Sequence, residues 1–194
     1  LGMSRFHAAH GTTAFLPTTL TAEQESIERA LRSIVEAVEQ GAEGAEIAGI
    51  HLEGPFISPK RCGAQHPEHI RPASIEELAA YIQMSKGRVR LITVAPEEPK
   101  AMELIRYAVQ NGITVSIGHS DATIEVIRQA VSNGATHVTH LFNGMRPLHH
   151  REPGTAGGAL MLDELAVELI CDGFHVHRDL IDYTFKVKPQ DKIV

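Results

Sequence analysis

Short apolar runs of strand length alternate along this chain with amphipathic runs of helix length, and this alternation restricts the fold more than any other feature. Gly and Pro residues mark the points where one kind of run gives way to the other. Strands that alternate with helices pair in parallel through right-handed crossovers, so the pattern predicts an α/β fold on a parallel sheet. The strands are expected at 13–18, 47–52, 88–94, 114–117, 136–141 and 166–171, with the start of another at 191–194, and the main helices at 21–40, about 99–110, about 122–131 and 180–186.

Polar residues follow several of these strands directly, and their positions favour one architecture over another. An open doubly wound sheet usually carries a Gly-rich nucleotide-binding turn, whereas a (β/α)8 TIM barrel collects polar residues at the carboxyl ends of many strands. The chain contains no GxGxxG or Walker motif. The sequence therefore predicts a (β/α)8 barrel whose rim carries the residues that follow its strands, namely Glu53, Glu97, His119, His140, and Asp172 with His175.

The length predicts a single catalytic domain over residues 1–194. A complete barrel usually takes about 250 residues, and only seven strand signals occur here. The chain also opens in a helix-like run at 3–9 and stops within a strand signal. We therefore expect a barrel that is incomplete at both ends.

Charge and composition exclude several classes of protein. With 18 Lys and Arg against 24 Asp and Glu, the net charge is −6, which argues against a nucleic-acid partner. No apolar stretch is long enough to span a membrane and no leader opens the chain, so we expect a soluble, cytoplasmic protein without a membrane partner. The two cysteines form no CxxC pair, but twelve histidines are an unusually high number. We therefore expect functional residues among the histidines.

Glu53, His119 and His140 are the candidate metal ligands. A carboxylate and two imidazoles suit a divalent transition metal, and three protein ligands leave a position open for water, as in catalytic sites. Each residue alone could instead be a strand-end hydrogen-bonding group or a helix cap. Their convergence at one rim favours one divalent ion per site, which could be zinc, iron, manganese or cobalt.

For other polar residues the sequence predicts weaker or structural roles. His175 could reach the same rim as an electrophile or proton carrier, with a surface histidine as the alternative. His51 is expected to be a packed core histidine, and Glu97 to complement a helix dipole. Residues 151–158 are expected to form a Gly-rich loop in which Arg151 could bind an anion, and Asn143 with Gly144 could fix substrate hydroxyls. Either segment could instead be an ordinary turn.

Five segments together resemble one family: 51–56 (HLEGPF), 118–123 (GHSDAT), 139–143 (THLFN), 151–154 (REPG) and 172–176 (DGFHV). In this order and spacing they are similar to the N-acetylglucosamine-6-phosphate deacetylases of the amidohydrolase superfamily, which are metal-dependent TIM barrels. The resemblance covers essentially the whole chain. It implies hydrolysis of the acetamide of N-acetylglucosamine 6-phosphate to glucosamine 6-phosphate and acetate, in amino-sugar catabolism.

The resemblance also implies roles for individual residues. Glu53, His119 and His140 would bind the metal, and His175 would be catalytic by polarising the acetamide carbonyl. The substrate contacts would come from Asn143, Gly144, His175 and Gln65, the last standing where some members have a histidine. Arg151 matches an arginine that reaches the phosphate in a neighbouring subunit, which implies a homodimer.

Three features of the family are absent from this sequence: a His-x-His pair on the first barrel strand, a β-sandwich built from both chain ends, and a catalytic aspartate on the eighth strand, expected just beyond Val194. The fragment alone is therefore expected to bind metal but to have weak activity or none. Two alternatives stay open. The chain could be another amidohydrolase, such as a deaminase or cyclic amidase, or a non-catalytic sugar-phosphate-binding fragment.

Overall fold

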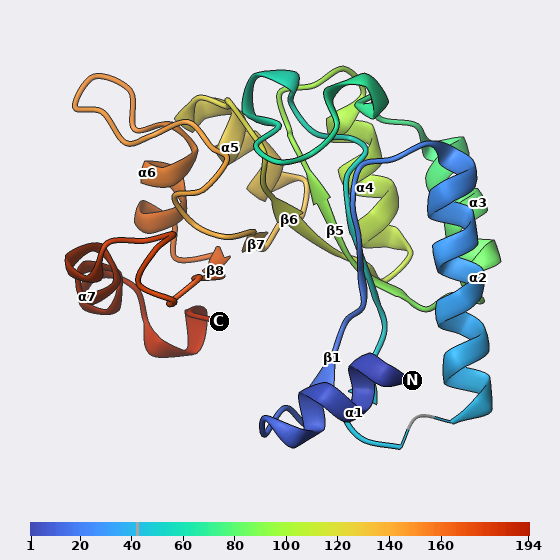
Figure 1. Ribbon diagram of the computed structural model, residues 1–194. Coiled ribbons are helices and arrows are strands. Elements are labelled where there is room, and N and C mark those ends of the chain that lie inside the picture. Colours follow the sequence, from blue (N-terminus) through green and yellow to red (C-terminus); the bar gives the residue numbers. More distant parts are fainter. Residues whose placement is uncertain (42) are drawn as a thin grey trace.

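The computed structural model describes residues 1–41 and 43–194, and its main feature is a six-stranded parallel sheet. The strand order is β2-β4-β5-β6-β7-β8, which follows the order of the chain except that β3 is left out, and Figure 1 labels β5 to β8 of this sheet. A separate parallel pair joins β1 and β3. The predicted parallel α/β fold is therefore confirmed. The strands are β1 (Ala14–Phe15), β2 (Thr18–Thr19), β3 (Glu46–Ile47), β4 (Ile50–Glu53), β5 (Val89–Val94), β6 (Thr114–Ile117), β7 (His137–Val138) and β8 (Ala166–Val167).

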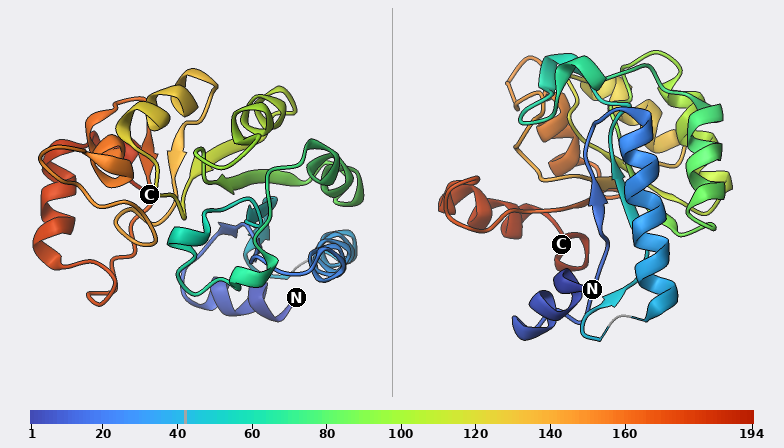
Figure 2. Two further views of the ribbon diagram at one scale, coloured as in Figure 1. Left: turned by 90° about the horizontal axis from the view of Figure 1, so that it is seen from above. Right: turned by 45° about the vertical axis from the view of Figure 1, so that its right-hand side comes forward.

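Helices connect successive strands and lie on the outer side of the curved sheet, as the view from above in Figure 2 shows. No helix in the described part of the chain is long and apolar enough to cross a membrane. The α-helices are α1 (Gly2–Ala9), α2 (Gln24–Gln40), α3 (Ile75–Met84), α4 (Ala101–Gln110), α5 (Ile124–Ser132), α6 (Gly154–Met161) and α7 (Arg178–Val187), and the short 3₁₀ turns are Pro59–Arg61, Pro67–His69 and Gln190–Lys192.

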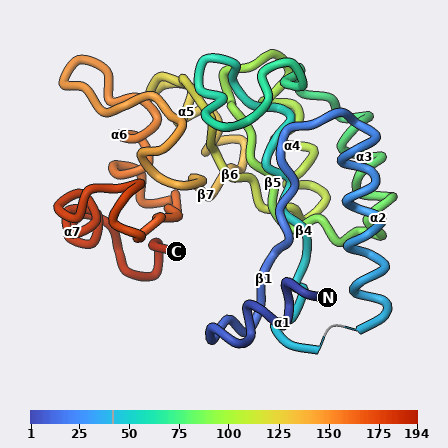
Figure 3. The backbone as a smooth tube through the Cα atoms, viewed as in Figure 1, coloured from blue at the N-terminus to red at the C-terminus, as the bar shows by residue number. Residues whose placement is uncertain are grey.

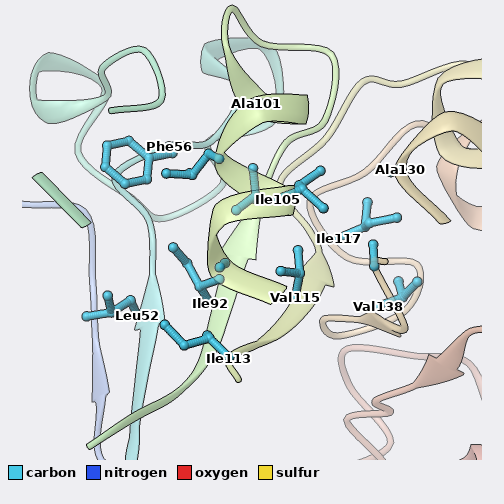
Figure 4. Close-up of a cluster of buried hydrophobic side chains, with 14 of the residues drawn as sticks. Leu52, Phe56, Ile92, Ala101, Ile105, Ile113, Val115, Ile117, Ala130 and Val138 are labelled. Atoms are coloured by element: carbon cyan, nitrogen blue, oxygen red, sulfur yellow. The ribbon is translucent and has the colours of Figure 1, made fainter. Parts of the chain in front are cut away.

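The hydrophobic core fills the space between the sheet and these helices (Figure 4). Ile92 of β5 and Ile117 of β6 are completely buried, as is Ile105 of α4. Burying an aliphatic side chain of this size contributes about 1.5–3 kcal/mol. The core therefore fixes the central strands, and with them the positions at which the strands end.

The structure differs from the sequence-based expectation at three element boundaries. The strand expected at 13–18 is divided into β1 and β2 around Pro17, which has no amide proton for a sheet ladder. Thr21 does not cap α2, because the helix begins at Gln24 with Glu23 in the N-cap position. Near the end of the chain, residues 190–192 form a 3₁₀ turn, and only Ile193 makes a bridge, to Val167.

The Gly-rich segment expected to be a loop is largely the helix α6. Its residues from Gly154 to Leu160 are all buried. A Cβ atom at Gly158 would lie 3.1 Å from side-chain atoms of Ile124 and Ile127 on α5. Glycine at this position therefore lets α6 pack closely against α5, and this packing outweighs the poor helix propensity of glycine.

A layer of polar side chains crosses the concave face of the sheet. Thr139 Oγ1 lies 2.7 Å from Ser116 Oγ and 2.8 Å from Thr93 Oγ1, and Thr93 Oγ1 lies 2.8 Å from His51 Nε2. All four residues are buried. The layer links β4, β5 and β6 to the residue after β7, and confirms His51 as a packed core histidine.

Replacing Thr139 with Val should therefore destabilise the protein by about 1–3 kcal/mol, because the hydroxyls of Ser116 and Thr93 lose their shared partner in a buried setting. Chemical denaturation of both proteins measures this difference. Thr136→Val, at an exposed position nearby, is the control and should change the free energy of unfolding by less than about 0.5 kcal/mol. Equal effects of the two substitutions would contradict the layer's role.

Candidate metal centre

Glu53, His119 and His140 meet at one point at the carboxyl edge of the sheet. Glu53 is the last residue of β4, His119 lies two residues beyond the end of β6, and His140 two beyond β7. His119 Nε2 lies 2.9 Å from Glu53 Oε1 and 3.0 Å from His140 Nε2. One ligand atom from each residue lies within 4.8 Å of the others, so the three side chains could hold one metal ion.

The orientation of the His119 ring is set by a backbone carbonyl. His119 Nδ1 lies 2.9 Å from the carbonyl oxygen of Arg61, in the long loop that follows β4. A carbonyl can only accept, so Nδ1 carries a proton, and in the neutral ring Nε2 then has the lone pair. That lone pair points toward Glu53 Oε1, which is the arrangement a metal ligand needs.

Charge within the cluster shifts the pKa values of its members. Burial disfavours the charged form of Glu53, but its contacts with the imidazoles of His119 and His140 outweigh burial and hold its pKa well below the usual range. Burial disfavours charge on His140 too, yet Glu53 raises its pKa overall. His51, two residues before Glu53, has its pKa lowered to about 4, chiefly by burial. The cluster is thus built around a carboxylate anion.

The chemistry of the donor set fits a cation. The lone pair of His119 Nε2 faces a carboxylate oxygen and a second imidazole nitrogen, so electron-rich atoms converge on one point. In addition, His140 Nδ1 is buried without a hydrogen-bond partner among the described residues. A divalent ion is the group that such a converging set of one carboxylate and two imidazoles binds.

The backbone at this site is strained. His119 has φ of 46°, His140 of 35° and Phe142 of 77°, values that residues other than glycine seldom adopt. Such conformations cost about 1–3 kcal/mol each and persist only where the surroundings enforce them. The conformation turns each histidine after its strand has ended, which allows the two rings to converge on Glu53.

A cavity of about 380 Å³ adjoins the three candidate ligands. Besides Glu53, His119 and His140, the wall of this cavity includes Gln65, Asn143, Gly144 and His175. The structure therefore brings together the residues predicted to bind the metal and most of those predicted to bind the substrate. Arg151 is the exception, because it is exposed and does not line this cavity.

Gln65 is the buried polar residue beside the ligands. Its side-chain oxygen accepts a hydrogen bond of 2.6 Å from the backbone amide of Thr21, and its side-chain nitrogen lies 3.2 Å from Glu53 Oε1. Thr21 therefore positions this side chain instead of capping a helix. The amide of Gln65 points its donor toward the carboxylate.

Glu97 has a different role from the one expected. It precedes α4, which begins at Ala101, and so lies outside the first turn of that helix. Its carboxylate instead accepts hydrogen bonds from the hydroxyl of Ser120 and the backbone amide of Asp121. Burial is the main reason that its pKa is raised. Glu97 thus holds the segment that follows His119.

Two contacts of the predicted site residues were not predicted from the sequence, although Asp172 itself was placed at the rim. Asp172 Oδ2 lies 2.6 Å from His175 Nδ1, and Asp172 Oδ1 accepts from the backbone amides of Phe174 and His175. These amide bonds are the main reason that the pKa of Asp172 is lowered to about 2. The three-residue spacing from Asp172 to His175 was the available signal. The carbonyl of Arg61 that binds His119 left no such signal, because any residue type supplies a carbonyl.

The curved parallel sheet with a Glu-His-His cluster at its carboxyl edge indicates a barrel protein with a metal site at its rim. Residues 1–193 match the model of the amidohydrolase family, and the chain belongs to this family.

Within the amidohydrolase family, the chain is similar to deacetylases of amino-sugar phosphates. The chain is 46% identical over 187 residues to the N-acetylglucosamine-6-phosphate deacetylase of Bacillus subtilis, covering 95% of this chain and 47% of the relative. It is 41% identical over 170 residues to the N-acetylgalactosamine-6-phosphate deacetylase of Escherichia coli O157:H7, covering 88% of this chain and 45% of the relative. The chain thus spans about half the length of the curated relatives it matches.

A solved structure shows the same fold. The N-acetyl-D-glucosamine-6-phosphate deacetylase of Mycobacterium smegmatis superimposes with a TM-score of 0.92 at 36% identity, covering 97% of this chain and 49% of that chain. A variant of the same enzyme has been solved in complex with N-acetyl-D-glucosamine-6-phosphate. The amidohydrolase TIM-barrel architecture expected from the sequence is therefore confirmed.

Proposed function

We propose that this chain supplies the metal centre and much of the substrate pocket of a deacetylase that hydrolyses the acetamide of N-acetylglucosamine 6-phosphate to glucosamine 6-phosphate and acetate. The observation that carries the proposal is the convergence of Glu53, His119 and His140 beside a cavity that His175 also lines. The relatives with this activity in their names support the choice of substrate.

In this proposal Glu53, His119 and His140 hold one divalent ion, which the donor set allows to be zinc, iron, manganese or cobalt. When bound, such an ion polarises a carbonyl group and activates water for attack. The chain's own contribution is to fix the three ligand atoms. The carboxylate of Glu53 supplies the negative charge, and the carbonyl of Arg61 keeps His119 in the tautomer that offers Nε2.

His175 is the proposed catalytic residue of the described chain. Asp172 occupies its Nδ1, so Nε2 is the ring nitrogen that remains for the acetamide carbonyl. A carboxylate at Nδ1 stabilises a positively charged ring, and a charged ring donates a strong hydrogen bond to an oxygen that gains negative charge. We assign His175 to that oxygen.

Gln65, Asn143 and Gly144 are the proposed contacts of the sugar, because all three line the cavity. Arg151 is exposed and outside the cavity, which agrees with a homodimer in which it reaches the phosphate bound by a neighbouring subunit. Within this proposal residues 1–194 belong to one catalytic domain of a cytoplasmic enzyme of amino-sugar catabolism.

The test places these residues in a complete relative. A chimera in which residues 1–194 replace the matching segment of the Bacillus subtilis relative should release acetate from N-acetylglucosamine 6-phosphate. Replacing His175 with Ala in the chimera should lower kcat by about 10²–10³, the usual cost of losing one oxyanion donor, while metal content stays the same. Acetate release and metal analysis measure the two quantities.

His177→Ala, at an exposed histidine two residues away, is the matched control and should leave kcat unchanged. N-acetylgalactosamine 6-phosphate is assayed in parallel, because one relative carries that substrate in its name. A folded, metal-loaded chimera that hydrolyses neither sugar phosphate would contradict the proposal. Hydrolysis of a cyclic amide or deamination of a base would then favour another amidohydrolase. Binding of a sugar phosphate without turnover would favour a non-catalytic binding fragment.

A further inference from the structure

His119 is held by contacts that lie outside the cluster of ligands. Its ring donates from Nδ1 to the carbonyl of Arg61 and packs against two glycines. A Cβ atom at Gly144 would lie 3.0 Å from His119 Nδ1, and one at Gly63 3.5 Å from His119 Cε1. The strained backbone and the close packing limit the positions of the ring, and the Arg61 carbonyl is the hydrogen-bond partner that fixes the proton on Nδ1 and holds Nε2 toward the other ligands.

The Arg61 carbonyl belongs to a loop, yet the side chain of the same residue is anchored. Nε and Nη2 of Arg61 each lie 2.8 Å from Asp121 Oδ1. Arg61 therefore connects two points, the ring of His119 through its carbonyl and the carboxylate of Asp121 through its guanidinium. The loop itself rises above the sheet at the top of Figure 3.

Asp121 is in turn fixed from two other directions. Its second oxygen, Oδ2, lies 2.8 Å from Nη2 of Arg146, and its backbone amide donates to Glu97. The side chain of Asp121 is only 12% exposed. We call Arg61, Asp121 and Arg146 the Asp121 clamp. It joins three segments that are distant in sequence: the loop after β4, the segment between β6 and α5, and the loop after β7.

We propose that Asp121 is a positioning residue for the metal centre, acting through Arg61 to hold the carbonyl that fixes the tautomer and the aim of His119. Partners of this kind orient metal-bound histidines, and their loss typically weakens metal affinity 10–100-fold. The inference rests on the proposed metal site. It adds to that site a residue that touches neither the ligand atoms nor the substrate cavity.

The test is the affinity of the metal-free protein for Co²⁺, measured by competition with a chelator. Asp121→Asn keeps the size of the side chain and removes the charge that both arginines share. We expect its Kd for Co²⁺ to rise about 10–100-fold over that of the unmodified protein. Independently of metal, ¹⁵N NMR of the imidazole nitrogens should show a lower population of the Nδ1-protonated tautomer of His119.

The matched control is Glu77→Gln. Glu77 binds Arg71, and its side chain is 11% exposed, close to the value for Asp121. Removing its charge breaks a comparable ion pair whose side-chain hydrogen bonds reach neither the three metal ligands nor Arg61, so any loss of stability should leave the Co²⁺ affinity and the His119 tautomer unchanged. Arg61→Lys is the second variant. It keeps the carbonyl and one charge but loses the two-atom contact, and we expect an intermediate loss of affinity.

The outcomes separate this inference from the proposed function. If the unmodified protein binds no Co²⁺, the metal site itself is wrong. If it binds Co²⁺ and Asp121→Asn binds within twofold of it with an unchanged His119 tautomer, the site stands and the positioning role is wrong. Equal weakening by Glu77→Gln would also overturn the role, because the effect would then follow general stability.

Discussion

Replacing Glu53 with Gln should weaken binding of a divalent metal at least about 100-fold, or about 2.7 kcal/mol. Changing residues that merely orient a ligand costs 10–100-fold, and here the only carboxylate of the cluster would be lost. Binding to the folded state raises stability by about 2.7 kcal/mol at a free metal concentration of 100 Kd. At the same metal concentration, metal binding should raise the free energy of unfolding of the Glu53→Gln variant by less than about 0.5 kcal/mol.

Thermal unfolding with and without zinc measures this difference, and metal analysis after dialysis measures occupancy. Glu28→Gln is the matched control, since Glu28 is a half-buried carboxylate on α2 that pairs with Arg32 and lies outside the ligand cluster. This control variant should bind zinc with at least a tenth of the affinity of the unmodified protein. A Glu53→Gln protein that binds zinc as tightly as the unmodified one would show that the cluster is not a metal site.

Replacing Gly54 with Ala should lower the free energy of unfolding by about 2–5 kcal/mol. Gly54 has φ of +95°, where a side chain costs about 1–2 kcal/mol, and an added Cβ would lie 2.1 Å from Thr21 Oγ1. Relieving such a clash shifts the backbone, which typically costs another 1–3 kcal/mol. Because Glu53 precedes this position, metal affinity should fall as well.

Two further variants separate the strain from the clash. Gly112 has φ of +71° with nothing within 4 Å of an added Cβ, so Gly112→Ala should cost only the strain of about 1–2 kcal/mol. Thr21 Oγ1 is buried without a hydrogen-bond partner among the described residues, so Thr21→Ala should recover part of the loss in the Gly54→Ala background. An interaction energy below about 0.5 kcal/mol in denaturation experiments would rule out the clash.

The order of the elements and the candidate ligands could be predicted from the sequence because both follow from local patterns. Hydrophobic periodicity marks strands and helices, and a residue that follows a parallel strand lies at a known edge of the sheet. Glu53, His119 and His140 were identified in this way without any knowledge of their contacts. Their convergence is what the structure adds.

The remaining features depend on contacts that no local pattern encodes. The helix α6 has the composition of a loop, and it forms because its glycines allow contact with α5. Glu97 lies where an acidic residue would suit a helix start, yet its partners are Ser120 and Asp121, more than twenty residues later. The Asp121 clamp similarly joins residues sixty positions apart. These pairings follow from tertiary packing.

The three ligands come from β4, from just after β6 and from just after β7, with β5 lying between β4 and β6. A slip of β4 by one residue would turn Glu53 to the opposite face of the sheet, away from both histidines. Only a chain whose four strands have all paired in the native alignment can thus present the full ligand set. The fraction of molecules that bind metal would then equal the fraction with all four strands correctly paired. During refolding, the time at which metal binding begins would be the time at which the last of these strands pairs.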